Sequence, residues 1–377
     1  MQHKGNMDLN KRDRLRILQL IYDHPDNPWC GGGGAGRAWA INNILAHHHD
    51  ITVLCGGFPN AKPQDNPFKV RFFDKAKAYV ESRVKFMQES RKIDPKPYDL
   101  VVEEFSYYAP IFSRFSCRPL VTILHGTHGL NALRYRGLYG ILSMVSEYLL
   151  LPRRRSVIVV SEHLRPSVKR ADRVLVIGQG AEIPDNLLPA TEEYVLFIGR
   201  LDVWHKGLDT LINAWSRLPL DPPSMPLYII GGGDQKKIRT LINSAGADNI
   251  FILGRLDHAG AMSAIRKAAF LCMPSRMEGS PLVLYEAFAL GKPVIASSIP
   301  AFDGLVQHEV NGLLVSPENP YELAKAIGKM IADVDLRSHL SRGAFEKGKE
   351  FNWDKIAEMQ EKFYLETVEG FKKRGVV

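Results

Sequence analysis

Short runs of β-branched and other apolar residues alternate with stretches of helical periodicity along almost the whole chain. This alternation is typical of parallel β-sheets whose strands are connected by helices. The first half of the chain contains strand-like runs at 16–22, 51–55, 69–73, 98–105, 119–126, 156–161 and 173–178. The second half contains similar runs at 194–200, 226–233, 249–255, 269–275, 292–298 and 312–316. The pattern therefore predicts two α/β sandwiches, each with six or seven strands.

The boundary between the two halves is predicted at 178–194, which contains two prolines, two glycines and no long apolar periodicity. A chain of 377 residues is also long for a single hydrophobic core. The predicted domains are 14–180 and 181–355, followed by a C-terminal helix at 356–377, and we expect residues 1–13 to be disordered. Doubly wound domains bind ligands at the carboxyl ends of their strands, so two of them are expected to face one cleft.

A glycine-rich stretch follows the first predicted strand, and Gly31, Gly33 and Gly36 spell G-x-G-x-x-G. In dinucleotide-binding proteins the strand runs directly into the first glycine, and an acidic residue follows about 20 positions later. Here eight residues separate Tyr22 from Gly31, and the next strand ends without an acid. The surroundings therefore argue against a dehydrogenase. They leave either a structural turn or a loop that presents backbone N–H groups and a helix N-terminus to an anion.

Two cations follow the first strand of the second half. Arg200 comes directly after that strand, and Lys206 lies six residues later, before the next helical stretch. Two cations beside the positive end of a helix suit a diphosphate group. The alternative is a pair of unrelated surface charges.

Two glutamates farther along are separated by seven residues. Glu278 lies in a loop after an apolar strand, and Pro281 is a residue type favoured in a first helical turn. Glu286 is then about one and a half turns into the helix. The N–H groups of the first turn, around Leu282 and Val283, lack partners within the helix. One carboxylate could bind sugar hydroxyls and the other the ribose of a nucleotide, although two solvated side chains are the ordinary alternative.

The chain carries 49 Lys and Arg against 41 Asp and Glu, which gives a net charge of +8. A moderate excess of this kind suits an anionic substrate, an acidic membrane surface or nucleic acid, or is simply a solvated basic face. Arginines at 134, 136, 153, 154 and 155 flank the apolar segment 137–151. That segment is too short to span a bilayer, and it is either an amphipathic helix that touches anionic lipids or a half-buried helix.

The sequence predicts no metal site. The triplet His47–His49 and the pair His125 and His128 lack a cysteine or acidic partner at ligand spacing. The only D-x-D, formed by Asp333 and Asp335, lies among the late helices and is expected to be a surface pair. The four cysteines show no C-x-x-C spacing, and the polar N-terminus shows no signal peptide, which favours a cytoplasmic protein. Nucleic-acid binding is not favoured, because no aromatic and basic motif of that class occurs.

Five segments of the second half, taken together and in order, resemble retaining glycosyltransferases of the GT-B fold, in particular glycosyltransferase family 4. They read GRLDVWHKGLDTLINAW, YIIGGGD, IFILGRLDH, MPSRMEGSPLVLYEAFALGKPVIAS and NGLLVSPEN. The first half is similar to this family more loosely, through the glycine-rich stretch, LHGTHG and VVSEHLRPSV. The terminal FNWDKIAE resembles the segment that in this family crosses back to the first domain.

The resemblance implies an α/β GT-B fold, in which two Rossmann-like doubly wound domains face a central cleft. The N-terminal domain would bind the acceptor and the C-terminal domain the nucleotide-sugar donor, with the last helix packing on the first domain. It implies a hexosyltransferase that moves a sugar with retention from a nucleotide-diphosphate sugar, with UDP and glucose as the default, to a saccharide or lipid-linked acceptor. Polysaccharide or glycolipid biosynthesis would follow, with no cofactor or metal required and with peripheral contact to an anionic membrane open.

The resemblance also implies roles for individual residues. Arg200 and Lys206 would neutralise the donor diphosphate, and Glu286 would hold the ribose hydroxyls. Glu278 would hold hydroxyls of the donor sugar, which His125 would face. Backbone groups would complete the donor site. Those of Gly33 and Gly34 would approach the diphosphate or the reacting centre, and Gly254 and Arg255 would lie near the base. These further donor-binding residues are Gly33, Gly34, Gly199, Gly254, Arg255, Gly279, Ser280, Pro281, Leu282 and Val283.

The sequence departs from the family pattern at two positions. Ser280 stands in E-G-S-P where the family often has E-G-F-G, a change expected to alter the cleft wall, and Gln179 replaces an asparagine before the second domain. Two alternatives remain beside the transferase. One is a sugar phosphorylase or nucleotide-sugar epimerase on the same fold. The other is a catalytically silent nucleotide-sugar-binding subunit, which the intact set of Arg200, Lys206, Glu278 and Glu286 argues against.

Overall fold

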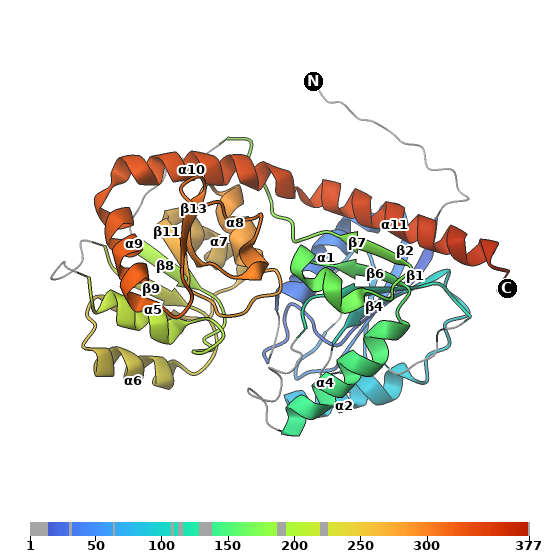
Figure 1. Cartoon of the computed structure of the whole chain (residues 1–377). Coiled ribbons are helices and arrows are strands. Elements are labelled where there is room, and N and C mark those ends of the chain that lie inside the picture. The colour runs from blue at the N-terminus through green and yellow to red at the C-terminus, as the bar shows by residue number, and fades with distance from the viewer. Residues whose placement is uncertain are drawn as a thin grey trace. The chain divides into compact units, whose positions relative to one another are not determined.

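The computed structural model describes residues 14–29, 32–62, 65–106, 109–111, 115, 117–127, 138–186, 194–218 and 225–375 of the chain. The chain divides into two compact units. The first unit comprises Met1–Gly178 together with Trp353–Val377, and the second comprises Gln179–Asn352. Each unit contains its own parallel sheet, as the ribbon in Figure 1 shows, and each has its own hydrophobic core.

The first unit is built on a seven-stranded sheet in which all neighbouring strands are parallel. Its strands are β1 Arg16–Ile21, β2 Asp50–Cys55, β3 Lys69–Phe72, β4 Leu100–Phe105, β5 Leu120–Leu124, β6 Ser156–Val159 and β7 Arg173–Val176. They lie in the order β3-β2-β1-β4-β5-β6-β7. The strands predicted for the first half are confirmed, with ends shifted by at most two residues.

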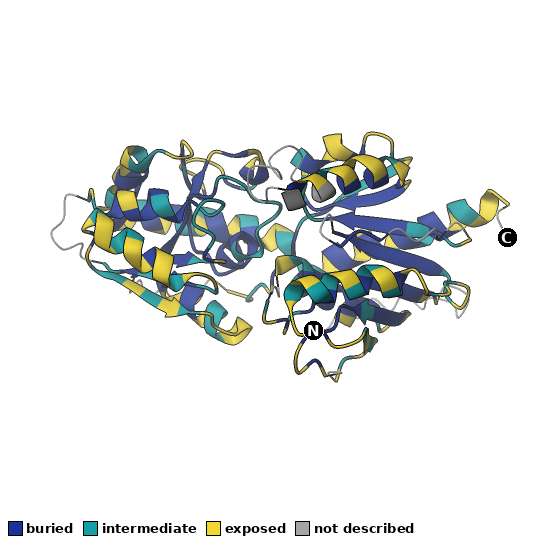
Figure 2. Ribbon diagram, turned by 90° about the horizontal axis from the view of Figure 1, so that it is seen from below, coloured by how far each residue is buried: buried dark blue, intermediate teal, exposed yellow. Residues whose placement is uncertain are grey.

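Helices cover both faces of this sheet. Those described are α1 Gly33–Leu45, α2 Tyr79–Ser90, α4 Leu138–Leu150 and α11 Trp353–Lys373, with the 3-10 turns η1 Leu151–Arg153 and η2 Glu162–Val168. Ile17 and Ile21 of β1 pack with α1 and α11, whereas Leu18 and Leu20 pack with α2. Successive strand residues point to opposite faces, so a strand covered on both sides is apolar at nearly every position. Figure 2 shows these strands buried beneath helices whose outer faces are exposed.

The first helix begins within the glycine-rich stretch. Gly33 and Gly34 are its first two residues, and Gly32 is the N-cap. The backbone N–H of Gly32 donates to Asp23 Oδ2 at 3.1 Å, while Gly31 lies outside the described residues. Gly33 and Gly34 are therefore first-turn residues of a helix, where N–H groups lack intrahelical partners, and are not part of a preceding loop.

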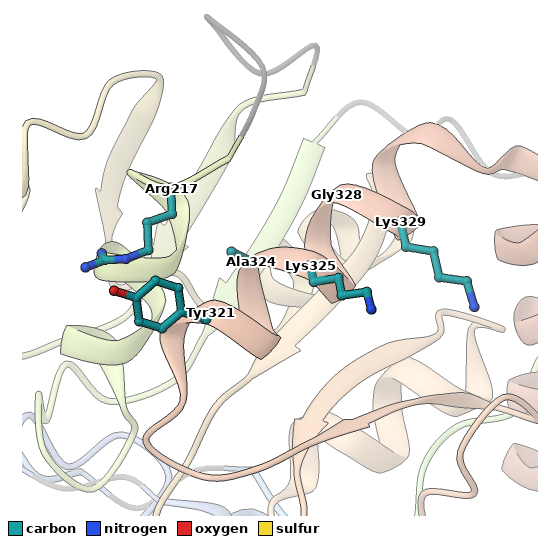
Figure 3. Close-up of a pocket in the computed structure, with 6 residues that line it drawn as sticks. All are labelled: Arg217, Tyr321, Ala324, Lys325, Gly328 and Lys329. Carbon is teal, nitrogen blue, oxygen red and sulfur yellow. The ribbon is translucent and has the colours of Figure 1, made fainter.

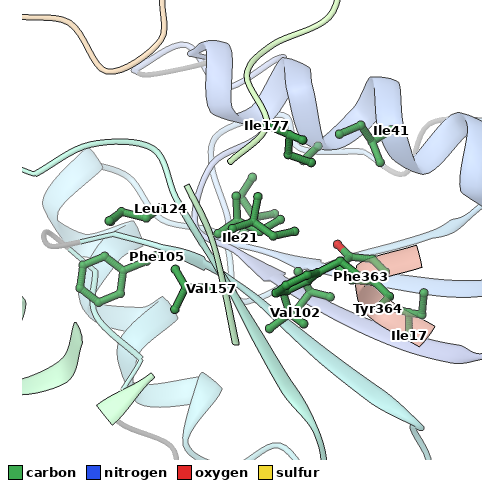
Figure 4. Packing of buried hydrophobic residues seen from close by; sticks show 14 of the residues in the cluster. Ile17, Ile21, Ile41, Val102, Phe105, Leu124, Val157, Ile177, Phe363 and Tyr364 are labelled. Atoms are coloured by element: carbon green, nitrogen blue, oxygen red, sulfur yellow. The ribbon is translucent and has the colours of Figure 1, made fainter. Parts of the chain in front are cut away.

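The C-terminal helix α11 joins the first unit through apolar and polar contacts. Phe363 and Tyr364 enter the same core as Ile17 and Val102 of the sheet, as Figure 4 shows. Arg37 of α1 is fully buried, and its Nη2 donates to Gln360 Oε1 at 2.9 Å. The helix therefore completes the core of the unit that begins the chain.

The second unit is built on a six-stranded parallel sheet in the order β10-β9-β8-β11-β12-β13. Its strands are β8 Tyr194–Ile198, β9 Leu227–Ile230, β10 Ile250–Gly254, β11 Ala268–Met273, β12 Val294–Ser297 and β13 Gly312–Val315. Its described helices are α5 Leu208–Trp215, α6 Gln235–Ala245, α7 His258–Lys267, α8 Leu282–Ala289, α9 Pro320–Ala332 and α10 Val334–Gly348, with the turns η3 Pro300–Phe302 and η4 Lys349–Phe351. The six strands predicted for the second half are thus confirmed.

Short polar side chains set the starts of several of these helices. Asp234 caps α6 by accepting from the N–H of Lys237 at 3.0 Å, and Asn319 caps α9 by accepting from Glu322 at 3.1 Å. Asp333 accepts from the N–H of Leu336 at 2.8 Å and so caps α10. An N-cap oxygen satisfies a backbone donor that the helix leaves open. The first carboxylate of the D-x-D therefore has a structural task.

The contact of α11 with the histidines that follow α1 contributes to the stability of the first unit. Glu361 Oε1 lies 2.9 Å from His49 Nε2 and 3.1 Å from His48 Nδ1, and the contact with His49 is the main cause that lowers the pKa of the Glu361 carboxyl. Glu361→Gln should lower the free energy of unfolding at pH 7 by about 1 kcal/mol. A carboxyl with a lowered folded pKa stabilises the fold above its ordinary pKa of 4.5 and loses that contribution as pH falls through the folded pKa.

The difference between wild type and Glu361→Gln should therefore be full at pH 7 and shrink below pH 4.5. Urea denaturation followed by circular dichroism at pH 7 and pH 4 measures it. Glu358→Gln, on an exposed position of the same helix, is the control and should change little. A difference that grows on acidification would contradict the role of the carboxylate.

Candidate functional site

The predicted site residues of the second unit follow the carboxyl ends of parallel strands. Gly199 and Arg200 come directly after β8, Arg255 after β10, and Glu278 five residues after the end of β11. Parallel strands bring their carboxyl ends to the same edge of a sheet. The three segments therefore lie along one edge of the second unit.

The turns at this edge approach one another closely. The N–H of Gly199 donates to Ile230 O at 2.9 Å, and the N–H of Gly231 donates to Gly254 O at 2.7 Å. A Cβ on Gly231 would lie 1.7 Å from Gly199 O, and the φ of Gly231 is +152°. Only glycine fits there, so the ends of β8, β9 and β10 are held at backbone contact.

Lys206 and Glu278 form an ion pair at the same edge. Lys206 Nζ lies 2.6 Å from Glu278 Oε1 and 2.8 Å from Oε2, and Ser275 Oγ also donates to Oε1 at 2.7 Å. The side chain of Glu278 is 8% exposed and that of Lys206 is 19% exposed. Gly199 lies beside them, since a Cβ there would meet Lys206 Cε at 3.9 Å. The structure thus brings together three of the predicted residues.

The loop that carries Lys206 is held against the loop that carries Glu278. Gly207 adopts a φ of +63°, and a Cβ on it would lie 1.9 Å from Pro274 O. Arg276 donates to Trp204 O at 2.8 Å and to Asp209 at 2.7 and 2.8 Å. A further hydrogen bond from Arg276 reaches Glu318 Oε1 at 2.7 Å. Arginine with its five donors can join several acceptors at once, and here it fixes both loops.

Arg276 was not among the residues that the sequence predicted for this site. Its signal was a cation two residues before Glu278, in a loop already predicted to carry chemistry. A surface charge and a buried anchor look the same in a sequence, because the difference lies in the partners that folding supplies.

Arg200 is exposed beside a carboxylate that has another partner. Asp202 Oδ2 lies 2.9 Å from His205 Nδ1, and this hydrogen bond is the main cause that lowers the pKa of Asp202. Among the residues that the structure describes, no carboxylate lies within ion-pair distance of the Arg200 guanidinium. The cation at the end of β8 is therefore available to an anionic ligand.

Glu286 is buried in α8, where it faces a histidine rather than another predicted site residue. It is 6% exposed, and His258 Nδ1 lies 3.7 Å from its Oε1. Burial is the main cause that raises the pKa of Glu286, the attraction of His258 opposes the rise, and the charge of Glu182 adds to it. A carboxyl in this setting gains from a hydrogen-bond donor such as a ligand hydroxyl.

The two positions that depart from the family pattern are hydrogen-bonded to each other. Gln179 Nε2 donates to Ser280 O at 3.2 Å, and the hydroxyl of Ser280 lies 2.9 Å from that of Tyr285. Pro281 is the N-cap of α8 and supplies no side-chain cap. The hydrogen bonds from Gln179 and Tyr285 therefore hold Ser280 and, with it, the backbone from Gly279 into Leu282 and Val283. The start of α8 is as predicted.

In the first unit the structure brings His125 next to the start of α1. His125 follows β5 directly, and a Cβ on Gly34 would lie 3.4 Å from its ring atoms Cε1 and Nε2. His125 Nε2 lies 2.6 Å from Glu104 Oε2 of β4. Gly33 precedes Gly34 in the same first turn, and His128 lies outside the described residues. The partner carboxylate of His125 was not predicted, and its only signal was a pair of acids inside the apolar run at 98–105.

Two other features carry no chemistry of this kind. Among the described residues, no group of three or more His, Cys, Asp and Glu side chains is arranged to hold a metal ion. A surface depression between the end of α5 and α9 is lined by Arg217, Tyr321, Ala324, Lys325, Gly328 and Lys329. Figure 3 shows the two lysines pointing away from Arg217 and Tyr321, so the charges do not converge on one point.

The fold and the edge of the second unit define a class of protein. Structural comparison finds the same fold over 94% of this chain and all of sucrose-phosphate synthase from Thermosynechococcus elongatus, with a TM-score of 0.77 and 22% identity. The Anabaena protein HepE, in a complex with UDP and glucose, matches over 93% of this chain and 99% of its own, with a TM-score of 0.69 and 21% identity. The fold is therefore the GT-B fold of glycosyltransferases.

Sequence comparison gives the family. The profile of the family described as glycosyl transferases group 1 matches residues 179–347, which is almost the whole of the second unit. An uncharacterised glycosyltransferase of Methanocaldococcus jannaschii is 29% identical over 386 aligned positions, which cover 91% of this chain and 96% of that protein. Residues 179–347 belong to the glycosyl transferases group 1, and the chain is a glycosyltransferase.

A prediction tests how the Lys206 loop is held. Gly207→Ala should lower the free energy of unfolding by roughly 3 kcal/mol or more, because the new Cβ would collide with Pro274 O at a left-handed φ. Gly246→Ala is the matched control, since Gly246 has a φ of +59° and no atom within 4 Å of the added Cβ. The control should lose only about 1–2 kcal/mol, the cost of the left-handed conformation. Equal losses, measured by urea denaturation, would show that the contact with Pro274 does not matter.

Proposed function

We propose that the protein transfers a hexose, with glucose as the first candidate, from a UDP-sugar to a saccharide or lipid-linked acceptor, with retention and without a metal ion. The observation that carries the proposal is the Lys206–Glu278 ion pair at the carboxyl edge of the second sheet. It combines a cation for a phosphate group with a carboxylate for sugar hydroxyls at a single point. We further propose a role in polysaccharide or glycolipid biosynthesis in the cytoplasm, as the resemblance to glycosyltransferase family 4 implies.

The diphosphate would be held by cations and a helix end. Arg200 and Lys206 flank the turn after β8, and the first turn of α8 offers the N–H groups of Leu282 and Val283. Charge that builds up on the leaving diphosphate is stabilised most by groups already in place. No metal ion is needed if these groups supply the positive charge.

The rest of the donor would lie along the same edge. Glu278 would accept hydrogen bonds from the hydroxyls of the sugar, and Glu286 from those of the ribose. Gly254 and Arg255, at the end of β10, would contact the base. The choice of UDP and glucose is supported by HepE, which binds both and shares this fold.

The first unit would contribute His125 and the start of α1. The side chain of His125 would face the donor sugar, and the N–H groups of Gly33 and Gly34 would approach the diphosphate or the reacting centre. In a retaining transfer without an enzymatic nucleophile, the acceptor hydroxyl attacks from the side of the leaving group. The bond from the anomeric carbon to the diphosphate breaks, the acceptor oxygen bonds to that carbon, and the hydroxyl proton passes to the leaving phosphate oxygen.

Two other functions are less well supported. A phosphorylase or epimerase of this fold gains no support from the relatives, which carry glycosyltransferase names. A silent nucleotide-sugar-binding subunit would not need the Lys206–Glu278 pair to be held by Ser275 and the Arg276 anchor. Transfer of sugar by the purified chain separates both from the proposal.

The surface of α4 supports the proposal of a lipid-linked acceptor at a membrane. Its residues Ile141, Val145, Tyr148 and Leu149 are exposed, with Tyr148 at 80%, and they recur at helical spacing. None of the described helices has the length and apolar character needed to cross a bilayer. An exposed apolar stripe beside cations is suited to the interface of an anionic membrane.

The prediction that the arginines around α4 form one basic surface is wrong for Arg154. Arg154 was grouped with the basic surface, but it is 9% exposed and its Nη2 donates to Glu103 Oε1 at 2.8 Å. Arg153 and Arg155 are exposed, whereas Arg134 and Arg136 lie outside the described residues. Of the five arginines, Arg153 and Arg155 are thus the exposed ones among the described residues, and Arg155 Nη1 lies 3.2 Å from Asp172 Oδ1. Arg154 is part of the interior.

The first functional prediction concerns the donor. UDP and UDP-glucose should raise the melting temperature of the purified protein, since ligands that bind the folded state stabilise it. Lys206→Ala should lower kcat about 100-fold or more, because a charge on the leaving group loses its partner. Lys329→Ala is the control, since Lys329 forms a similar pair with Glu309 at the surface. Near wild-type turnover in Lys206→Ala, with the fold intact, would refute the assignment.

The second functional prediction concerns the membrane. Replacing Arg153 and Arg155 together by glutamine should weaken binding to vesicles of phosphatidylglycerol and phosphatidylcholine roughly 30-fold, at about 1 kcal/mol per cation. Replacing the exposed Arg239 and Arg266 of the second unit by glutamine removes the same charge elsewhere and is the control. Equal weakening by both pairs would mean that only net charge matters.

A further inference from the structure

A chain of buried polar side chains leads through the first unit to His125. Asn42 Nδ2 of α1 donates to Gln19 Oε1 of β1 at 2.6 Å, and Gln19 Nε2 donates to Glu104 Oε1 of β4 at 2.6 Å. The other oxygen of Glu104, Oε2, lies 2.6 Å from His125 Nε2. These hydrogen bonds thus connect α1, β1 and β4 to His125, which follows β5 and is proposed to face the donor.

The burial of this chain sets it apart from an ordinary surface network. Gln19 is 2% exposed, Asn42 is 4% and Glu104 is 5%, whereas the side chain of His125 is 24% exposed. A polar group that is removed from water costs free energy unless its hydrogen bonds are replaced. Each member here has such a bond, and the only member that reaches solvent is the histidine.

The neighbouring acid has a different partner and a different task. Glu103 forms an ion pair with Arg154, whose Nε lies 2.7 Å from its Oε2, and accepts a hydrogen bond from Thr122. Its charge is therefore neutralised by a permanent cation. Glu104 has no such cation at ion-pair distance among the described residues, and His125 is the basic group that faces it there.

The direction of the hydrogen bonds fixes the state of the ring. A carboxylate oxygen accepts and cannot donate, so the proton of this contact is on His125 Nε2. Gln19 already donates to the other oxygen of Glu104. In a neutral ring this leaves Nδ1 with a free lone pair, and no described residue forms a hydrogen bond to Nδ1. The first turn of α1 lies beside the ring, since a Cβ on Gly34 would be 3.4 Å from Cε1 and Nε2.

We propose that Glu104, held by Gln19 and Asn42, is a positioning residue that fixes His125 in the Nε2–H tautomer. Nδ1 is then the ring atom that accepts a hydrogen bond from a substrate hydroxyl. The role of Nδ1 toward a substrate rests on the function proposed above. The tautomer itself rests only on the buried chain.

Glu104→Gln tests this proposal because it keeps the shape of the side chain. If Gln19 keeps its present orientation, the new amide oxygen accepts from Gln19 Nε2 and the new NH2 group donates to His125 Nε2. The ring must then carry its proton on Nδ1. NMR spectra of protein labelled with 15N at histidine should show the two ring nitrogens exchanging their protonated and unprotonated signatures. With Nδ1 no longer an acceptor, kcat should fall about 10- to 100-fold.

Two comparisons separate positioning from a general structural effect. In a His125→Ala background, Glu104→Gln should cause no further loss of kcat, because Glu104 acts through the ring. Glu361→Gln is the matched control, since it removes the carboxylate that faces His48 and His49 at the far end of α1. It should leave both kcat and the His125 spectrum unchanged.

The outcomes are decisive in each direction. A proton on Nδ1 in the wild-type protein would overturn the proposal. An equal loss of activity in the His125→Ala background would also overturn it. If the variant does not fold, the wild-type spectrum still decides the tautomer. If the protein transfers no sugar, the proposed function fails while the spectra continue to test the tautomer.

Discussion

Parallel strand pairing is the constraint on which the rest of this structure depends. When all strands of a sheet point the same way, their carboxyl ends lie at one edge and every connection must return across a face. The helices that make these returns cover both faces, so the edge is where polar groups can gather. In the second unit this edge carries Gly199, Arg200, Arg255 and the loop to Glu278, which come from distant parts of the sequence.

Crowding at that edge explains why the loops are rich in glycine and in charge. The backbones at Gly199 and Gly231 approach so closely that no side chain fits, and Gly207 touches Pro274 in the same way. Loops packed by backbone contact have little apolar surface to hold them. Arg276 and the Lys206–Glu278 pair supply that attachment through charged hydrogen bonds. Lys206 and Glu278 thus join the two loops and would also bind a donor, whereas Arg276 only holds the loops.

The first unit shows the same division of labour in its interior. Its strands are largely apolar on both faces, and Gln19, Glu103 and Glu104 are among the buried polar residues that interrupt them. Glu103 is matched by Arg154, whereas Glu104 is matched by His125, a residue that stays partly in contact with solvent. Burial of a carboxylate costs free energy unless the carboxylate has a partner. The partner of Glu104 is His125, and this contact orients the histidine ring. The profile of the glycosyl transferases group 1 lies almost wholly within the second unit, at residues 179–347.

The sequence by itself determined the strands, their alternation with helices and the start of α8, because apolar periodicity and helix-start residues act over a few positions. It also placed Glu278 and Glu286 on a loop and a helix, since eight residues of local geometry suffice for that. Only the tertiary structure decided that Lys206 meets Glu278, 72 positions away, and that Glu104 meets Gln19, 85 positions away. Those partners depend on the order of the strands, which local sequence does not encode. For the same reason Arg154 lies inside while its neighbours remain outside.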